Sequence, residues 1–102
     1  MLEVSLAEKL IEQITRYTDY NVNIMNGDGI IIASRDPDRI GAYHEPAWRI
    51  LHGKEDIITV DSDSDYPGVS RGINMAIEID GRRAGGVGVT GDPDEIRPIA
   101  LI

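Results

Sequence analysis

The stretch GINMAIEIDGRRAGGVGVTG, residues 72–91, decides the class of this fold. In residues 72–79 isoleucine and methionine alternate with other residues, as in a β-strand with one face in a core. Asp80-Gly81 is a strong signal for a tight two-residue turn. Residues 82–91 then return as a second strand, so the stretch predicts an antiparallel β-hairpin.

The N-terminal third of the chain predicts a helix followed by another hairpin. Residues 5–17 repeat apolar side chains at helical spacing, and Ser5 and Glu8 form a capping-box pattern at the start. Residues 21–34, NVNIMNGDGIIIAS, change to a strand period, with NGDG as the turn. The unbroken run of isoleucines at 30–32 indicates a strand covered on both faces.

The remaining elements are expected to be short. We predict a helical turn over 37–40 with Asp36 as its cap, a helix over 44–52 with Ala47, Trp48, Ile50 and Leu51 inward, a strand over 56–60, a polar loop over 61–68, and a helix beginning at Asp92-Pro93. This order predicts one α+β domain, residues 1–102, with a mostly antiparallel sheet of about five strands. Sensor domains of the PAS and Cache type share the order, as do other small α+β domains.

Composition narrows the possible partners. The chain has 102 residues, no cysteine, 10 Lys and Arg, and 18 Asp and Glu. The missing cysteines exclude disulfides, thiolate zinc sites and thiol nucleophiles, and suit a reducing compartment. The formal net charge of -8 argues against direct contact with nucleic acid or an anionic membrane. No secretory signal or apolar run of membrane-spanning length is expected. A small anionic ligand would need positive charge gathered at one place.

The stretch RIGAYHE, from Arg39 to Glu45, gathers such charge. Arg39 ends the short helical turn, His44 starts the next helix, and Gly41 lies at the bend between them. Arginine can bind a carboxylate through two parallel hydrogen bonds, and the free N–H groups of a helix start add positive potential. The pattern suggests an anion cradle. Spacing alone explains it at least as well by a surface arginine and a histidine that caps the helix.

A second candidate site is SRGIN, residues 70–74. Arg71 and Gly72 lie where a loop enters a strand, and Asn74 can both donate and accept hydrogen bonds. If this stretch faces RIGAYHE across the sheet, the two together suit a ligand with anionic ends and hydroxyl groups.

Three other motifs lack the context that their chemistry needs. GVGVTG, residues 86–91, matches a dinucleotide fingerprint but does not open a βαβ unit, and a glycine-rich strand that leaves room for a ligand or helix explains it better. The acidic loop at 61–68 lacks the glycine and bidentate glutamate of a calcium loop. No serine lies in a nucleophile elbow. We therefore expect no metal, no cofactor and no enzymatic reaction.

Three stretches in order resemble the sugar diacid recognition domain, the N-terminal module of the carbohydrate diacid regulators, which are bacterial transcription factors. They are NVNIMNGDGIIIASRDPDRIGAYHEPA (21–47), GINMAI (72–77) and GGVGVTGDPDEIRPIALI (85–102). The resemblance extends over nearly the whole chain. It implies a cytoplasmic, PAS/Cache-like sensor that acts as a homodimer and binds a sugar diacid such as glucarate or galactarate, or the related glycerate.

The resemblance also implies where the ligand binds. The positions carried over as ligand contacts are Arg39, Gly41, His44, Glu45, Arg71, Gly72, Asn74 and Gly91. The arginines would pair with carboxylates, His44 and Asn74 would form hydrogen bonds, and Gly72 would allow close backbone approach.

The sequence departs from the family pattern at two places and is expected to lack a longer C-terminal helix and the DNA-binding region. Met75-Ala76 replaces the usual Leu-Pro, and Pro46 and Trp48 stand where small residues are common. The identity of the acid therefore stays open. The alternatives are a dimerisation or interaction module without a ligand, and a small-molecule enzyme.

Overall fold

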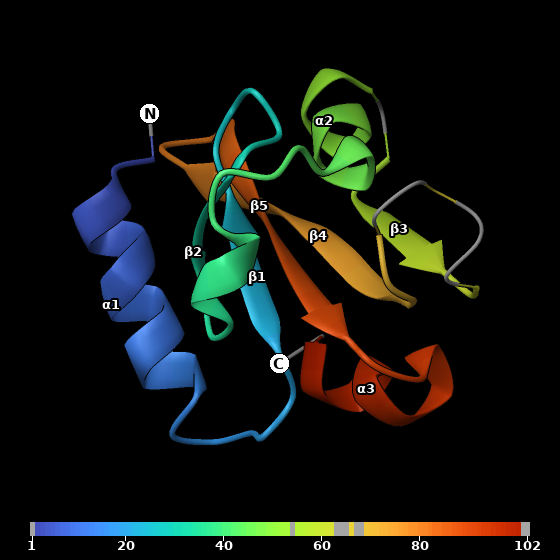
Figure 1. Cartoon of the computed structure of the whole chain (residues 1–102). Helices are drawn as coiled ribbons and strands as arrows, with labels where there is room; N and C mark the ends of the chain where they lie inside the picture. Colours follow the sequence, from blue (N-terminus) through green and yellow to red (C-terminus); the bar gives the residue numbers. More distant parts are fainter. Residues whose placement is uncertain (1, 54, 63–65, 67–68, 101–102) are drawn as a thin grey trace.

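The computed structural model describes residues 2–53, 55–62, 66 and 69–100 (Figure 1). In chain order the elements are α1 (Val4–Ile14), β1 (Val22–Met25), β2 (Ile31–Ser34), the 3-10 helix η1 (Pro37–Arg39), α2 (Glu45–His52), β3 (Ile57–Val60), β4 (Gly72–Ile79), β5 (Arg82–Thr90) and α3 (Pro93–Ala100). The strands form one five-stranded sheet in the order β2-β1-β5-β4-β3, and the strand pairings are antiparallel. The predicted α+β class and the number of strands are confirmed.

The predicted hairpin of residues 72–91 forms the middle of the sheet. β4 and β5 pair along their whole length, from Gly72 opposite Thr90 to Ile79 opposite Arg82. Both turn residues have positive φ, 53° at Asp80 and 77° at Gly81, which is the backbone of a type I′ turn. Because β5 also pairs with β1 and β4 with β3, this hairpin joins the two halves of the sheet.

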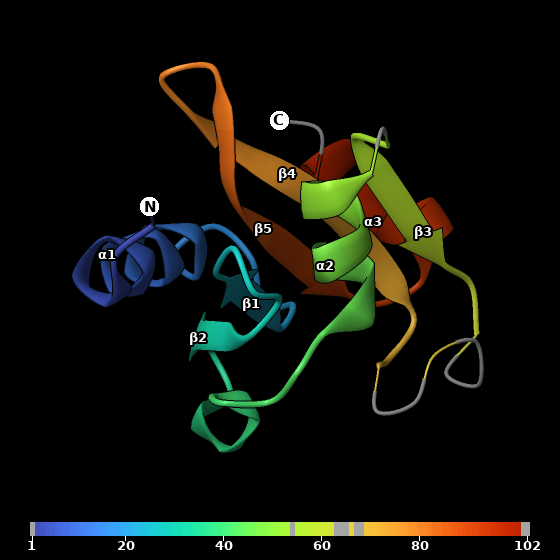
Figure 2. The same cartoon turned by 90° about the horizontal axis from the view of Figure 1, so that it is seen from above.

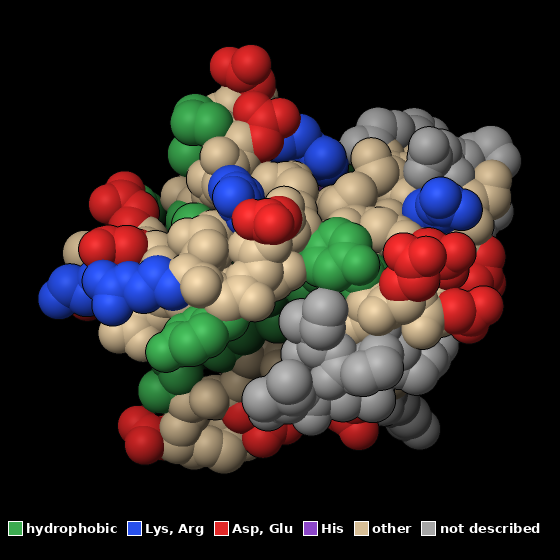
Figure 3. Space-filling model, turned by 90° about the horizontal axis from the view of Figure 1, so that it is seen from below, with side chains coloured by type: hydrophobic (Ala, Val, Ile, Leu, Met, Phe, Trp, Pro, Cys, Tyr) green, Lys and Arg blue, Asp and Glu red, His purple; other side chains and the backbone are tan. Residues whose placement is uncertain are grey.

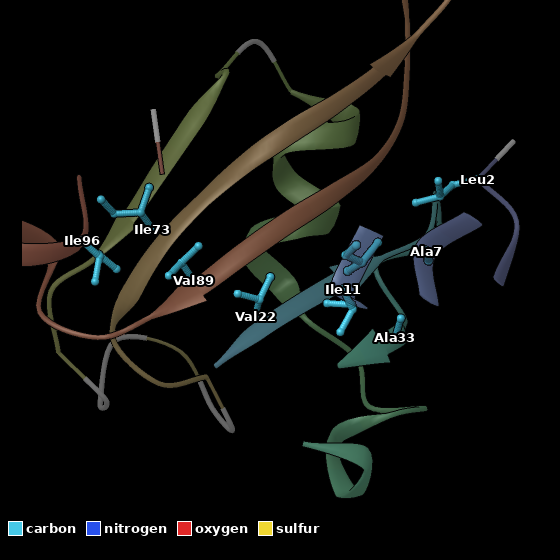
Figure 4. Packing of buried hydrophobic residues seen from close by; sticks show 9 residues of the cluster. Leu2, Ala7, Ile11, Val22, Ala33, Ile73, Val89 and Ile96 are labelled. Carbon is cyan, nitrogen blue, oxygen red and sulfur yellow. The ribbon is translucent and has the colours of Figure 1, made fainter. Parts of the chain in front are cut away.

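The helices cover opposite faces of the sheet. Viewed from above, α1 and α3 lie on one side, and α2 and η1 on the other (Figure 2). The larger core cluster lies on the α1 and α3 side, and its buried members are Leu2, Ala7, Ile11, Val22, Ile24, Ala33, Ile73, Val89 and Ile96 (Figure 4). On the α2 side the buried apolar cluster is smaller and consists of Met25, Ile31 and Ala47. The isoleucine run is thus covered on both faces, since Ile32 packs against the larger cluster.

Two details of α1 differ from the prediction. Its N-cap is Glu3, and no side chain caps it, so the predicted capping box of Ser5 and Glu8 was wrong. The helix ends at Ile14 instead of residue 17 and continues as a turn, which leaves Tyr17 87% exposed. None of the helices in the described ranges has both the length and the apolar character needed to cross a membrane.

Trp48 was predicted to point inward from α2, and this was wrong. Its side chain is 43% exposed and its ring lies 4.5 Å from that of His52. Pro46, Ala47 and Ile50 occupy the face of α2 that meets the sheet. Trp48 follows Ala47 by one residue, about 100° further round the helix, and its Cβ instead packs over Gly29 in the turn between β1 and β2.

Candidate functional site

The RIGAYHE stretch is held in place by backbone hydrogen bonds beside β2. Gly41 N donates to Ile31 O at 2.8 Å, and Ile31 N donates back to Ala42 O at 2.9 Å. His44 N donates to Gly29 O at 2.7 Å. Gly41 has a φ of +95°, which favours glycine, and the space beside its Cα is open. The stretch is therefore a fixed extension of the first hairpin that leads into α2.

The turn before this stretch is capped as the sequence predicts. Asp36 Oδ1 accepts a hydrogen bond from Asp38 N at 3.1 Å, with Pro37 at the first helical position. Asp36 N in turn donates to Ser34 Oγ at 3.0 Å, at the end of β2. These contacts fix η1 on the α2 side of the sheet, with Arg39 as its last residue.

His44 is the most unusual side chain in the stretch. It is the N-cap residue of α2, as one of the two explanations from the sequence had it, but its side chain forms no capping hydrogen bond, so capping does not account for the imidazole. The residue is only 4% exposed, and its Nδ1 has no hydrogen-bond partner among the described residues. Burial, with a smaller contribution from the nearby positive charge of Arg39, lowers the pKa of His44 to about 4. The folded protein thus holds a neutral, incompletely paired imidazole beside an arginine.

The start of α2 offers fewer donors than the sequence suggested. Pro46 has no N–H group, and Trp48 N already donates to His44 O at 3.3 Å. The free donors of the first turn are therefore the N–H groups of Glu45 and Ala47. The exposed Glu45 carboxylate complements the positive end of the helix dipole. That gives Glu45 a structural reason to be acidic, independent of any ligand.

The second predicted cluster lies where β4 begins and β5 ends. Gly91 N donates to Arg71 O at 3.0 Å, and Gly72 pairs with Thr90. A Cβ on Gly72 would lie 2.2 Å from Val89 O, so glycine is required there by the backbone of the neighbouring strand. Asn74 is buried, and its Nδ2 donates to Ile58 O at 3.5 Å.

Gly91 has a different environment from the other predicted contacts. A Cβ on this residue would lie 3.0 Å from Ile96 and 3.3 Å from the ring of Tyr20. Both neighbours pack with the larger core cluster, on the opposite side of the sheet from α2. The glycine thus has a packing reason, and its predicted contact with a ligand stays a prediction.

A row of one serine, two asparagines and a glycine crosses the sheet from β2 to β4. We call it the polar row, and its members are Ser34, Asn23, Gly88 and Asn74, each paired with the next on the neighbouring strand. Asn23 is 2% exposed, and its Oδ1 accepts hydrogen bonds from Ser34 Oγ at 2.5 Å and Asn21 Nδ2 at 3.3 Å. Sequence reasoning missed Asn23 and Ser34, whereas Gly88 was included only as part of the glycine-rich strand 86–91 that leaves room for a ligand or a helix. The alternation N-V-N-I was the available signal, but it was used to predict a strand and not a buried polar face.

Other positive and polar features at the surface have structural roles. Arg83 donates hydrogen bonds to Ile50 O, to Glu55 O at 2.6 Å and to Asp56, so it ties the end of α2 to β3 and β5. An open hollow of about 620 Å³ lies at the tips of the two hairpins, and none of the predicted ligand contacts lines it. It is lined by Gly27, Ile79, Asp80, Arg82, Arg83 and Ala84.

Positive charge is local on the face of the molecule that is seen from below. From below, Asp and Glu side chains are scattered around the outline, and Lys and Arg occur at a few separate places (Figure 3). This face carries no broad basic surface among the residues drawn as described. Such a pattern suits a small anion held by one or two arginines better than a polyanion.

Comparison with known proteins identifies the family. The family model described as "Putative sugar diacid recognition" matches residues 2–102. The carbohydrate diacid regulator of Escherichia coli (strain K12) is 33% identical over 97 residues, which cover 94% of this chain and 25% of that protein. The uncharacterized protein YsfB of Bacillus subtilis (strain 168) is 35% identical over 100 residues, which cover 95% of this chain and 27% of that protein.

A third relative, an uncharacterized protein of Haemophilus influenzae, is 28% identical over 102 residues, covering 97% of this chain and 27% of that protein. The chain thus spans about a quarter of the length of the curated relatives it matches. The family match extends over the helices, the sheet and both clusters described above. The chain therefore belongs to the sugar diacid recognition family, the recognition domain found in a carbohydrate diacid regulator.

Proposed function

We propose that this domain is a PAS/Cache-like sensor that binds a small hydroxy-carboxylate of the sugar diacid type and catalyses no reaction. The observation that carries the proposal is His44, a buried imidazole whose Nδ1 lacks a partner among the described residues and whose neighbour is Arg39. Buried polar atoms are almost always hydrogen-bonded in folded proteins. A carboxylate that binds there would pair with Arg39 and bring a partner for the imidazole.

The negative charge of such a ligand would also change the protonation state of the His44 imidazole. A carboxylate beside His44 would favour its protonated form, which donates from both ring nitrogens. Arg39 would then bind the same anion through its guanidinium. Arg71 would meet the second acidic group of the ligand, with Gly72 and Asn74 next to it on β4.

The output of the sensor would be a change in conformational equilibrium. A ligand shifts such an equilibrium only by its difference in affinity for the two states. We propose that residues 1–102 act as one sensing domain in a cytoplasmic homodimer, and that ligand binding controls a DNA-binding region elsewhere in the full-length regulator.

Thermal-shift and calorimetric titrations with glucarate, galactarate, glycerate, tartrate and citrate test the proposal. At least one acid should raise the melting temperature by several degrees, and Arg39→Gln should weaken its binding by about tenfold or more. Arg16→Gln is the matched control, since Arg16 is exposed and pairs, among the described residues, with the exposed Glu12 of α1. If no acid stabilises the wild-type domain at millimolar concentration, the proposal fails.

A dimerisation module without a ligand is the second candidate, and the surface of α1 supports it. Val4 and Leu6 are 50% and 43% exposed on this helix, and Tyr17 follows it at 87%. Sedimentation of the wild-type domain and of Leu6→Glu distinguishes the two candidates. A dimer that is lost in Leu6→Glu, combined with no response to any acid, would favour this second function.

A further inference from the structure

We propose that Asn23 and Asn74, on either side of Gly88, recognise the hydroxyl groups of the ligand. The polar row would then select polyhydroxy acids over acids of the same length without hydroxyls. This inference rests on the proposed function and assigns the specificity of the same site. It concerns the middle of the ligand, whereas Arg39, His44 and Arg71 concern its ends.

The polar row lies on a single face of the sheet, the one that α2 covers. Asn23 pairs with Gly88 on one side, and Asn74 pairs with Gly88 on the other. Residues directly opposite in antiparallel strands point to the same face. Gly86, two positions from Gly88 on β5, shares that face, and a Cβ on it would lie 3.5 Å from the Cβ of Ala47 in α2.

The two asparagines are buried without using their full hydrogen-bonding capacity. A carboxamide offers two N–H donors and an acceptor oxygen. In the described part of the chain, the hydrogen bonds at Asn23 all use Oδ1, and the bond at Asn74 is the long one from Nδ2 to Ile58 O. Groups that can both donate and accept are suited to hydroxyls, which do the same.

Packing does not require polar side chains at these places. The opposite face of the same strands is filled by aliphatic residues, so the rows next to the polar row bury apolar side chains; they include Val22, Ile24, Ile73 and Val89. Asparagine in a buried strand is unfavourable unless its amide is paired. A polar ligand on the α2 side would supply those partners.

Gly88 sets the position of Asn74. A Cβ on Gly88 would lie 2.5 Å from Asn74 Oδ1, and its next neighbours, Asn74 Cγ and the terminal carbon of Met25, would be 3.6 Å away. The carboxamide of Asn74 therefore occupies the space that any side chain at position 88 would take. Met25 adds a flexible apolar wall beside the same glycine.

The polar row also has the right ends and span for a diacid. At one end Ser34 Oγ accepts from Asp36 N, which leads into η1 and Arg39. At the other end Asn74 follows Arg71 and Gly72 on the strand. Since strands lie about 4.8 Å apart, the backbones of Asn23 and Asn74 are about 10 Å apart. Their side chains can reach a short hydroxylated chain lying between them.

Calorimetric titration with galactarate and with adipate, which has the same carbon chain but no hydroxyls, tests the inference. Gly88→Ala should fold, because its close contact is with the movable end of one side chain. It should weaken galactarate binding by about tenfold or more, because a site built to pair with hydroxyls loses much when its groups are displaced. Gly86→Ala is the matched control, since its Cβ would meet only ordinary contacts of 3.4–3.6 Å.

A second variant keeps the test decisive if Gly88→Ala is poorly folded. Asn74→Leu keeps the number and branching of the side-chain heavy atoms but removes the polar groups, and it should lower the preference for galactarate over adipate by about tenfold. Equal binding of both acids by the wild type, with loss of both in Arg39→Gln, would retain the proposed function and refute hydroxyl recognition. Unchanged galactarate binding in Asn74→Leu would also refute it. A wild type that binds neither galactarate nor any other acid of the panel would instead refute the proposed function.

Discussion

The two faces of the central sheet differ in what their side chains do. The face under α1 and α3 is filled by aliphatic residues, whereas the face under α2 carries asparagines, a serine and glycines beside its smaller apolar cluster. Adjacent residues of β1 show the contrast directly, since Ile24 joins the larger core and Asn23 joins the polar row. The alternation of a single strand thus separates the aliphatic core from the face that we propose for recognition.

The largest expected effect is on the aliphatic face. Ile24 is fully buried, so Ile24→Ala should lower the free energy of unfolding by about 3–4 kcal/mol through lost apolar contacts and a new cavity. Urea unfolding followed by circular dichroism measures it. Asn23→Leu, at the neighbouring position on the other face, should cost less than half as much. Equal losses in both variants would contradict the division between the faces.

The next effect concerns His44 and pH. The unfolded state takes up a proton as the pH falls through 6.5, but folded His44 resists protonation down to about pH 4. The contribution of neutral His44 to the free energy of unfolding is therefore complete above pH 6.5 and is lost as the pH falls from 6.5 to about 4. The loss should approach about 3 kcal/mol, because each pKa unit corresponds to about 1.4 kcal/mol.

Urea unfolding at a series of pH values, with His44→Gln beside the wild type, isolates this contribution. The difference in the free energy of unfolding between the wild type and His44→Gln should change between pH 6.5 and about pH 4. His52→Gln is the control, since His52 is exposed on the outer side of α2 and stacks on Trp48. A wild type whose pH dependence matches that of His44→Gln would show that the imidazole is not buried in neutral form.

A smaller effect on stability is expected from Asn74→Leu, on the face of the sheet that α2 covers. Removing a buried amide that forms one long hydrogen bond should change the free energy of unfolding by no more than about 1 kcal/mol, in either direction. Thermal unfolding without ligand measures it. A loss of several kcal/mol would mean that the amide is a structural element of the polar face and not one kept for a ligand.

The smallest effect is expected outside both faces. Trp48→Ser removes a half-exposed ring that stacks on His52, so its cost should stay below about 1 kcal/mol. Chemical denaturation provides the value. A cost as large as that of Ile24→Ala would restore the inward position that the sequence predicted for this residue.

Local chemistry made much of the fold predictable. Asp80-Gly81 can supply two residues with positive φ, and Asp36-Pro37 supplies a cap and a first helical residue, so both turns follow from their own side chains. The prediction of a capping box at Ser5 was wrong because a cap depends on where the helix starts, and α1 starts at Val4 with Ser5 already inside it. The prediction that Trp48 points inward was wrong because the apolar residues of an eight-residue helix allow more than one choice of buried face.

The sequence by itself determined the hairpins, the order of elements and the concentration of charge at RIGAYHE, because these depend on neighbours a few residues apart. Only the tertiary structure decided that the ring of His44 is buried, that Gly91 packs against Tyr20 and Ile96, and that Asn23 and Asn74 flank Gly88. Those facts depend on strand register and on which face α2 covers. Register joins residues far apart in the chain, so it can be read only once the strands are paired.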